Sequence, residues 1–375
     1  MDEPFGLYVH LPWCVRKCPY CDFNSHALKD TLDERGYVRA LLEDVDLQQP
    51  AFEGRLLASI FIGGGTPSLF SPDAIHALLE GIGQRLTLAV DCEITLEANP
   101  GTVEQARFSG YRQAGVNRLS LGLQSFNGRH LEQLGRIHDG DQARKALDAA
   151  FKAGFSRING DLMFGLPHQS LNQALDDVNT LLQWPVEHVS LYQLTLEPNT
   201  LFAHQPPKGL PEHDALADMH DALIRHLQQA GFQRYEISAF ARDGGACRHN
   251  LNYWCFGDYL GIGAGAHGKH SRSEPLRTRR PRHPRAYLDT VAAGLPAVTE
   301  SIPASQLPFE FMLNALRLVD GVAEPRFHQT TGLPLSRIQP LLETLRAEGL
   351  LRNGRLACTA LGLRFLDSIT ARFLP

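Results

Sequence analysis

The first 240 residues repeat one pattern, a short apolar run followed by a stretch with the apolar spacing of a helix. The apolar runs, rich in β-branched residues, are residues 6–12, 59–67, 92–100, 117–125, 156–167 and 187–198. Several helical stretches end in Ala-Gly, which is typical of helices that finish at a glycine. Because alternating strands and helices build parallel sheets with crossover helices, the sequence predicts an α/β fold, a partial (β/α)6 barrel of the TIM type.

We expect three parts along the chain, and the barrel is the first, at residues 1–240. Residues 241–304 contain a stretch dense in glycine, aromatics and histidine, followed by a basic, proline-rich segment that we interpret as a surface connector. Residues 305–375 contain helical patterns and Asn353-Gly354, a strong hairpin signal between two apolar runs. This combination predicts a small winged-helix-like α+β module. Its few basic residues favour packing or interaction over DNA binding.

Composition narrows the function classes. The 375 residues carry a net charge of -5, whereas a general nucleic-acid binder normally has a basic excess. No apolar run approaches the length that spans a bilayer. The acidic start MDEPFG has the features of neither a signal peptide nor a transit peptide. We therefore expect a cytoplasmic protein with no nucleic-acid partner.

Three of the seven cysteines form a C-x3-C-x2-C run directly after the first expected strand: Cys14, Cys18 and Cys21. An odd, clustered set argues against a disulfide scaffold and favours metal or redox chemistry. Thiolates are soft ligands for zinc, copper(I) or iron–sulfur clusters. A structural zinc site needs four ligands, and His10 or His26 could supply the fourth. A [4Fe-4S] cluster on three thiolates instead leaves one iron free to bind a small molecule.

Polar and glycine residues gather where the expected strands end, which is the face where α/β barrels place their sites. The segment GGGTPS, residues 63–68, follows the second strand and offers backbone groups for close approach by an amino-acid ligand. Glu97, Gln124 and Asp161 belong to the later strands. Each of these residues, taken alone, is equally well explained as an ordinary polar residue of a barrel rim.

The cysteine spacing, with Tyr20 just before the third cysteine, resembles the radical S-adenosylmethionine (SAM) superfamily. There the open iron of a [4Fe-4S] cluster chelates SAM, and one electron cleaves SAM to a 5'-deoxyadenosyl radical. The resemblance implies that the three cysteines are the metal ligands and that flavodoxin or ferredoxin donates electrons. It implies the following SAM-binding residues: Tyr8, Tyr20, Gly64, Gly65, Thr66, Glu97, Gln124, Arg136, Asp161, Thr195 and His267.

Further segments are similar to the oxygen-independent coproporphyrinogen III oxidase family, over most of the chain including the C-terminal module. They are residues 8–25, 63–68, 96–102, 120–126, 134–138, 161–169 and 235–241. One branch of the family decarboxylates two propionates of coproporphyrinogen, and the HemW branch is understood as heme chaperones. The oxidases carry a further cysteine two residues after the third, where this chain has Phe23. The segment HNLNYW, residues 249–254, matches the HNxxYW motif associated with heme binding, so the resemblance favours HemW.

The residues of this motif suit heme. A neutral imidazole, here His249, is a good axial ligand, and Tyr253 and Trp254 offer flat apolar area. Asn250 completes the candidate heme-binding set. Cys247 and Cys255 flank the motif, but there is no C-x-x-C-H for covalent attachment of the usual kind. A histidine and two aromatics packed in a domain interface explain the same pattern.

We therefore expect a heme chaperone with a [4Fe-4S] cluster and exchangeable SAM, which passes heme to hemoproteins of the respiratory chain. The alternative is a radical SAM coproporphyrinogen III oxidase. A winged-helix regulator with a redox cluster is disfavoured by the acidic charge. The sequence names no catalytic residue and leaves open whether the protein is an enzyme, forms a homodimer or touches a membrane surface.

Overall fold

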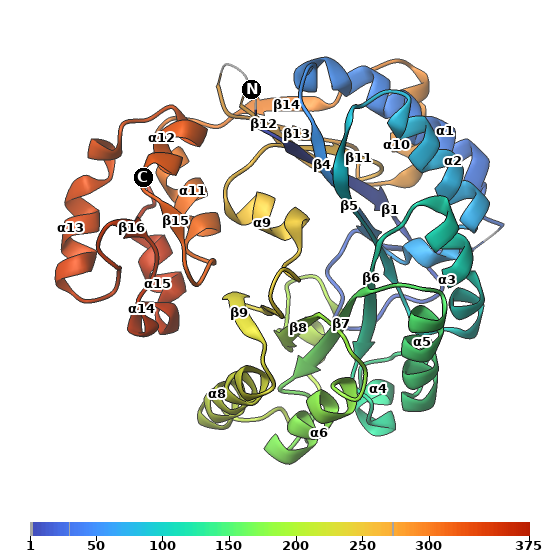
Figure 1. Ribbon diagram of the computed structural model, residues 1–375, viewed down its shortest axis with the longest axis horizontal. Coiled ribbons are helices and arrows are strands. Elements are labelled where there is room, and N and C mark those ends of the chain that lie inside the picture. Colours follow the sequence, from blue (N-terminus) through green and yellow to red (C-terminus); the bar gives the residue numbers. More distant parts are fainter. Residues whose placement is uncertain (1–2, 30, 272–273) are drawn as a thin grey trace.

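The computed structural model describes residues 3–29, 31–271 and 274–375. Six parallel strands lie side by side in chain order, and all six were expected from the sequence (Figure 1). They are β1 (Phe5–Leu11), β4 (Leu57–Gly64), β5 (Leu88–Ala98), β6 (Arg118–Gln124), β7 (Arg157–Phe164) and β8 (His188–Gln193). The predicted α/β fold with a barrel-like parallel sheet is confirmed.

The sheet continues beyond both ends of this parallel set to twelve strands. Beside β1, β11 (Tyr259–Ile262) adds a seventh parallel strand, and β12 (His267–His270), β13 (Leu276–Arg279) and β14 (Val298–Ser301) follow antiparallel. Beside β8 lie β10 (Ala239–Ala241) and β9 (Gln233–Glu236), also antiparallel. The sequence did not reveal β11, because a strand of four residues within a glycine-rich stretch is too short to show a periodicity.

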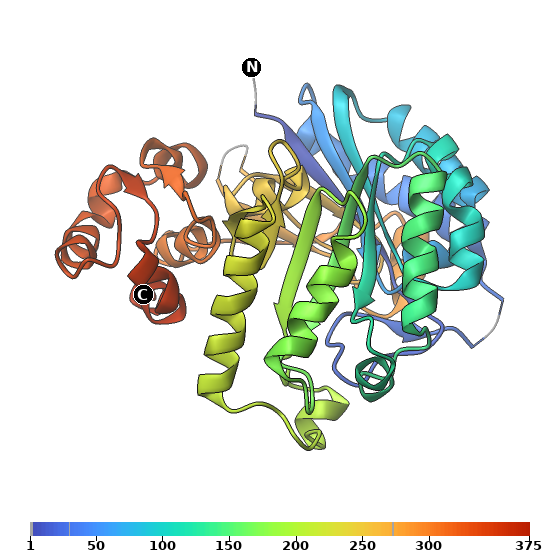
Figure 2. The same ribbon diagram turned by 60° about the horizontal axis from the view of Figure 1, so that its bottom comes forward.

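Helices cover the outer face of the curved sheet (Figure 2). They are α1 (Glu34–Gln48), α2 (Pro72–Gly83), α3 (Thr102–Ala114), α5 (Gly140–Lys152), α6 (Leu171–Leu181) and α8 (His213–Gln229). In β6, Leu119, Leu121 and Leu123 are fully buried in the core, and strand alternation directs Ser120 and Gln124 to the opposite, inner face. Burying each such leucine contributes about 2 kcal/mol.

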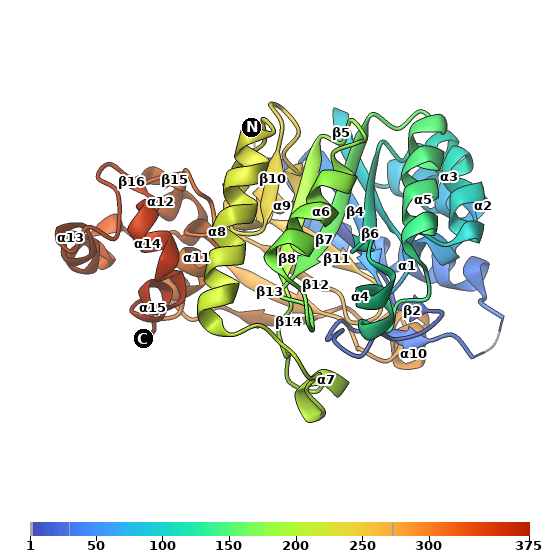
Figure 3. The same cartoon turned by 90° about the horizontal axis from the view of Figure 1, so that it is seen from below.

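Short elements connect the strands at the end where β1 and β4 finish. A parallel pair, β2 (Trp13–Cys14) and β3 (His26–Ala27), brackets the three cysteines. The helical turn η2 (Pro67–Leu69) follows β4 at this end, and α4 (Gly128–Gln133) and α7 (Leu201–His204) follow β6 and β8. The turn η1 (Gln49–Phe52) instead precedes β4 at the opposite end, where Phe52 stacks on Phe5. Figure 3 shows β2, α4, α7 and α10 (Pro284–Ala292) at one end of the sheet.

The C-terminal part forms a second hydrophobic core beside the sheet, with Phe311 and Phe327 fully buried in it (Figure 1). Its elements are α11 (Leu307–Ala315), β15 (Val322–Ala323), α12 (Pro325–Thr331), η3 (Leu335–Arg337), α13 (Gln339–Ala347), β16 (Arg355–Leu356), α14 (Ala360–Arg364) and α15 (Leu366–Ala371). An antiparallel bridge between Leu351 and Cys358 encloses Asn353-Gly354, where the sequence predicts a turn.

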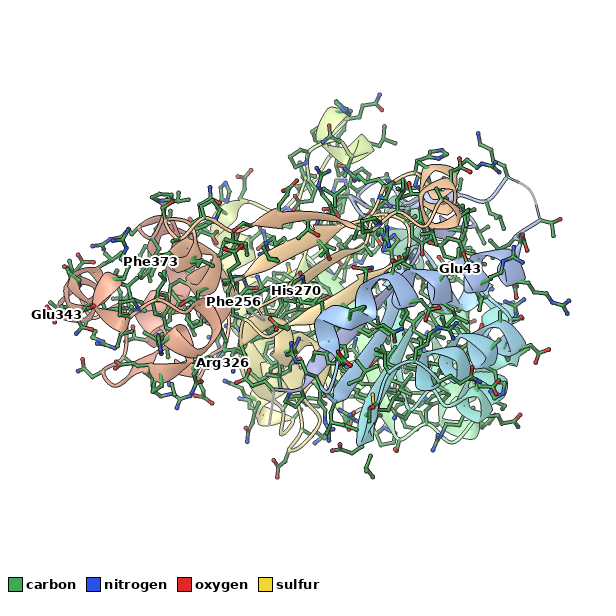
Figure 4. The ribbon with its side chains drawn as sticks, turned by 90° about the horizontal axis from the view of Figure 1, so that it is seen from above. Glu43, Phe256, His270, Arg326, Glu343 and Phe373 are labelled. Atoms are coloured by element: carbon green, nitrogen blue, oxygen red, sulfur yellow. The ribbon has the colours of Figure 1, made fainter. Side chains whose placement is uncertain are left out.

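One helix connects the two cores. Helix α9 (Arg248–Trp254) lies inside the curve of the sheet, and Leu251 and Trp254 pack on the C-terminal core (Figure 1). Phe256 and Arg326 lie at the junction in Figure 4, where Arg326 Nε donates to the carbonyl of Cys255 at 2.9 Å. Of the helices in the described ranges, none is long and apolar enough to cross a bilayer.

Candidate functional site

The three clustered cysteines lie on one loop, residues 12–27, which we call the cysteine loop. Cys14 is buried, whereas Cys18 and Cys21 are half-buried, and all three are free thiols. Burial raises the pKa of Cys14, and the neighbouring Cys18 raises it further. Burial likewise raises the pKa of Cys21, and the neighbouring Cys14 and Cys18 raise it further. Because Cys18 acts electrostatically on both Cys14 and Cys21, the three side chains lie close together in the loop.

Backbone contacts fix the shape of this loop. The N–H groups of His26 and Thr66 donate to the carbonyls of Pro12 and Trp13, each at 2.7 Å. A Cβ atom at Gly65 would lie 2.5 Å from the carbonyl oxygen of Trp13, so only glycine permits this close approach. The glycine segment after β4 therefore supports the cysteine loop directly.

Three soft thiol donors on one loop fit the ligand type of an iron–sulfur cluster. Among the described residues, no group of three or more His, Cys, Asp or Glu side chains is arranged to bind one ion. In a cluster, each thiolate binds a different iron, so the sulfurs surround a larger object. Arg136 Nη1 lies 3.7 Å from Cys18 Sγ, which places a positive charge beside the thiolates that such a cluster requires.

Arg136 connects several of the expected SAM-binding residues to the cysteine loop. Its Nη2 donates to Asn99 Oδ1 at 2.6 Å, and Asn99 Nδ2 donates to Thr66 Oγ1 at 3.0 Å. Tyr20 is also close, since Arg136 opposes the rise in the pKa of Tyr20 that burial causes. Arg136 Nε is buried and has no hydrogen-bond partner among the described residues. A free donor at this position suits a polar ligand.

Beside Arg136, a cavity of ≈ 460 Å³ adjoins the cysteine loop. Arg16 and Glu132 line it from the loop and from α4, and Ile137 and His138 line it from the segment before α5. Of the expected SAM-binding residues, Arg136 lines this cavity.

The expected carboxyl groups lie on the inner face of the sheet. Glu97 Oε2 accepts the N–H of Gly64 at 3.2 Å. Burial raises the pKa of Glu97 to about 8, and the negative charge of Asp161 adds to the shift. Asp161 accepts from the hydroxyl of Ser120 at 3.1 Å and from Asn159 Nδ2 at 2.8 Å. These contacts bring Gly64, Glu97 and Asp161 together across β4, β5 and β7.

Of the other expected SAM-binding residues, some lie near the cysteine loop and others are exposed. The hydroxyl of Tyr8 lies 2.9 Å from His10 Nδ1, near the cysteine loop. Gln124 has a φ of 67°, in the left-handed region where a non-glycine residue is strained, as residues at functional sites often are. Thr195 and His267 are exposed, and within the described ranges no side-chain hydrogen bond joins either of them to the other candidates.

The heme motif lies at the opposite end of the sheet. His249, 1% exposed, packs against Gly6 and Ser59, near the starts of β1 and β4, whereas the cysteine loop follows the end of β1. Its Nδ1 lies 3.1 Å from Ser59 Oγ, and its ring stacks on Phe61 with centroids 5.2 Å apart. Burial lowers the pKa of His249 to about 3, so the ring is neutral.

The Nε2 atom of His249 is buried and has no partner in the described part of the chain, so it is free to ligate a metal but enclosed. Tyr253 packs edge-on against His249 at 4.7 Å. Trp254 instead faces the C-terminal core, with the guanidinium of Arg317 4.3 Å from its ring centroid. Asn250 is half-buried. In this arrangement the Nε2 atom of His249 is closed off from solvent.

Two residues in the site were missed by the sequence analysis. Asn99 joins Arg136 to Thr66, and its position inside a matched segment, residues 96–102, was an available signal. Asn24 lies in the cysteine loop, and its Nδ2 donates to the carbonyls of Ala264 and Arg282, each at 2.9 Å. These partners are 240 and 258 residues away, so no local pattern predicted the contacts.

Two family models and a solved structure match this chain. The radical SAM superfamily model matches residues 8–181, and the HemN C-terminal domain model matches residues 302–365. Coproporphyrinogen III oxidase (HemN) from Escherichia coli has a similar fold, with a TM-score of 0.82 at 23% identity over 99% of this chain and 90% of that one. The chain is a member of the radical SAM superfamily.

Full-length relatives narrow the assignment. The chain is 47% identical to heme chaperone HemW of Escherichia coli (strain K12), over 99% of this chain and 98% of the relative. It is 48% identical to heme chaperone HemW of Haemophilus influenzae, over 90% and 88% of the two chains. The mitochondrial radical S-adenosyl methionine domain-containing protein 1 of Bos taurus is 35% identical over 98% and 87%. The chain therefore belongs to the HemW family.

Proposed function

We propose that this protein is a heme chaperone that carries a [4Fe-4S] cluster and SAM at one end of its sheet and binds heme at α9 at the other. The observation that carries the proposal is the 47% identity to a heme chaperone across both chains, which spans the cysteine loop, α9 and the C-terminal module alike. Acceptor hemoproteins, including those of respiratory chains, are the proposed destination of the heme.

In this proposal Cys14, Cys18 and Cys21 bind the cluster, which when bound supplies one-electron chemistry to SAM. Arg136 places positive charge beside Cys18, with its Nη1 3.7 Å from the sulfur. Gly64, Gly65 and Thr66 offer backbone groups for the amino group of SAM. The remaining proposed SAM-binding residues are Tyr8, Tyr20, Glu97, Gln124, Arg136, Asp161, Thr195 and His267.

An electron donor of the flavodoxin or ferredoxin kind is the proposed partner at the cysteine loop. Phe23 is 63% exposed and Val15 is 54% exposed, so the loop presents apolar surface to the outside. Arg16 and Lys17 are exposed beside them, which favours an acidic partner. The half-buried state of Cys18 and Cys21 leaves a short path for electrons from such a partner.

At the other end, His249 is the proposed heme ligand, with Asn250, Tyr253 and Trp254 around it. The free Nε2 of His249 supports this role, since its Nδ1 already has a partner in Ser59 and so leaves Nε2 for iron. Because α9 encloses this atom, loading requires the C-terminal core to release Trp254 and the helix to move away from β4.

The first experiment reconstitutes the cluster without oxygen and titrates the protein with heme, read in the Soret band. In parallel, the same preparation is incubated with coproporphyrinogen, SAM and a reductant, and protoporphyrinogen is measured. We expect stoichiometric heme binding and no decarboxylation. Decarboxylation would instead support the oxidase alternative and would show that a chain with Phe23 at this position can have that activity.

A variant pair tests the ligand. His249→Ala should weaken heme binding and leave the iron and sulfide content unchanged. The control is His328→Ala, which alters an exposed histidine of α12. If His249→Ala bound heme as tightly as the unaltered protein, another residue would be the ligand.

A further inference from the structure

A fully buried ion pair joins α1 to the segment before α10. Asp44 and Arg280 are both 0% exposed in their side chains. Asp44 Oδ1 accepts from Arg280 Nε at 2.9 Å and from Gln48 Nε2 at 2.6 Å. Its Oδ2 accepts from the hydroxyl of Tyr287 at 3.0 Å and from the N–H of Gly263 at 3.2 Å. One carboxylate thus receives donors from residues more than 200 positions away in the chain.

Helix α1 binds the backbone of the loop between β11 and β12, residues 263–266, which we call the glycine loop. In addition to the Asp44 contact with Gly263, the N–H of Ala264 donates to the hydroxyl of Tyr37 at 2.9 Å. Gln48 Nε2 also donates to the carbonyl of Gly261, at the end of β11, at 3.1 Å. Three side chains of α1 therefore determine where the glycine loop lies.

The glycine loop lies against the cysteine loop. Since β11 runs parallel to β1, both strands end at the same side of the sheet. A Cβ atom at Gly263 would lie 2.3 Å from the carbonyl oxygen of His10, which leaves no space for a side chain. Asn24, three residues after the last clustered cysteine, donates to the carbonyl of Ala264 at 2.9 Å.

We propose that Asp44, paired with Arg280, is a positioning residue for SAM: it fixes the glycine loop against the cysteine loop without touching the cofactor. The inference rests on the proposed function, in which SAM binds at this end of the sheet and His267 follows the glycine loop. A ligand bound between two loops depends on the distance between them, and small displacements of positioning groups weaken binding strongly.

A general stabilising role does not explain the arrangement as well. Burying two opposite charges costs desolvation that their attraction only partly offsets, so apolar residues would stabilise this interface equally well. The carboxylate of Asp44 differs from an apolar side chain because its hydrogen bonds hold their donors in defined positions. These donors are the backbone N–H of Gly263, the hydroxyl of Tyr287 and the guanidinium of Arg280.

The test uses two variants of the full chain. Asp44→Asn removes the negative charge and places an amide beside donors, and Tyr287→Phe removes a single donor to Oδ2 while it keeps the ion pair. The control is Glu236→Gln, which alters another buried carboxylate, paired with Arg317 at 3.1 Å near the C-terminal core. Thermal unfolding, iron content and heme binding are measured for all three.

The first readout needs no cofactor. Hydrogen exchange of the Gly263 and Ala264 amides should be faster in Asp44→Asn than in the unaltered protein, and unchanged in Glu236→Gln. The second readout is the SAM dissociation constant of the reconstituted proteins by equilibrium dialysis. We expect it to rise roughly tenfold or more in Asp44→Asn, the size typical for loss of a residue that orients a site, with iron content retained. Tyr287→Phe should give a smaller rise.

The outcomes separate the inference from the function on which it rests. If the unaltered reconstituted protein binds no SAM, the proposed function fails. If it binds SAM and the folded Tyr287→Phe and Asp44→Asn proteins bind equally tightly, Asp44 is not a positioning residue. If Glu236→Gln weakens SAM binding as much as Asp44→Asn does, the effect is general destabilisation, and the inference is overturned.

Discussion

The carboxylate of Glu93 accepts hydrogen bonds from the backbone N–H of His249, at 3.3 Å, and from that of Arg248, at 2.9 Å. A residue of β5 thus satisfies the first amides of α9, which carry partial positive charge and lack partners within the helix. Burial alone would raise the pKa of Glu93, but Arg118, Arg157 and the two amides hold it below its usual value. The heme motif is therefore tied to the interior of the sheet by one ionised side chain.

Replacing the carboxylate of Glu93 tests whether it holds α9 against the sheet. Glu93→Gln breaks the buried pair with Arg157, whose Nη1 lies 2.8 Å away, and should lower the free energy of unfolding by about 3 kcal/mol. Urea denaturation measures the loss, and hydrogen exchange should show faster opening of α9. Glu300→Gln, which alters an exposed pair with Arg279, should cost less than about 1 kcal/mol. Equal costs for the two variants would contradict the prediction.

We expect the thiols of the cysteine loop, and not those elsewhere in the chain, to bind the cluster. Cys14→Ala should leave the sheet folded, because the loop follows β1 and does not form its core, but should abolish iron and sulfide after reconstitution. Cys358→Ala, which alters a buried thiol of the C-terminal core, should retain full iron content. Iron and sulfide assays and the visible absorbance measure this. A Cys14→Ala protein with unchanged cluster content would mean that the ligand set is wrong.

The pKa of Glu97 predicts how SAM affinity depends on pH. With its pKa raised from 4.5 to about 8, Glu97 is protonated at neutral pH in the free protein. SAM carries positive charge, which favours the carboxylate, so binding should release a proton from Glu97. The affinity should therefore rise as pH increases towards about 8 and level off above it. Equilibrium dialysis across this range measures the rise, and Glu97→Gln should flatten it. An equally steep profile in Glu97→Gln would assign the proton elsewhere.

The pKa of His249 predicts sensitivity of the fold to acid. The unfolded chain protonates this side chain below about pH 6.5, whereas the folded protein keeps it neutral down to about pH 3. The stability that neutral His249 contributes is therefore fully present above about pH 6.5. It is lost as pH falls from about 6.5 to about 3, by up to about 1.4 kcal/mol per pH unit. In His249→Gln, the free energy of unfolding measured by urea denaturation should fall less steeply with decreasing pH. Some slope should remain, because burial also lowers the pKa of His138, to about 4. An unchanged slope would mean that His249 is accessible to protons.

The sequence predicted that several candidate residues would lie close together, because their motifs lie at or near strand ends. Thr66 follows β4, Glu97 lies next to the end of β5 and Asp161 lies within β7, and parallel strands run towards the same edge of the sheet. The connections among such residues were not predictable. Arg136 reaches Asn99 and Cys18, 37 and 118 residues away, because α4 and its flanking turns fold back over the cysteine loop.

The amino-acid sequence by itself determined the six parallel strands, the helices that cover them and the cysteine run, because apolar periodicity and ligand spacing are local properties of the chain. Only the tertiary structure decided that β11 pairs with β1, that Asp44 binds Gly263, and that His249 is enclosed between β4 and Tyr253. These contacts join residues far apart in the chain. They arise because buried polar groups must find partners wherever packing brings those partners close.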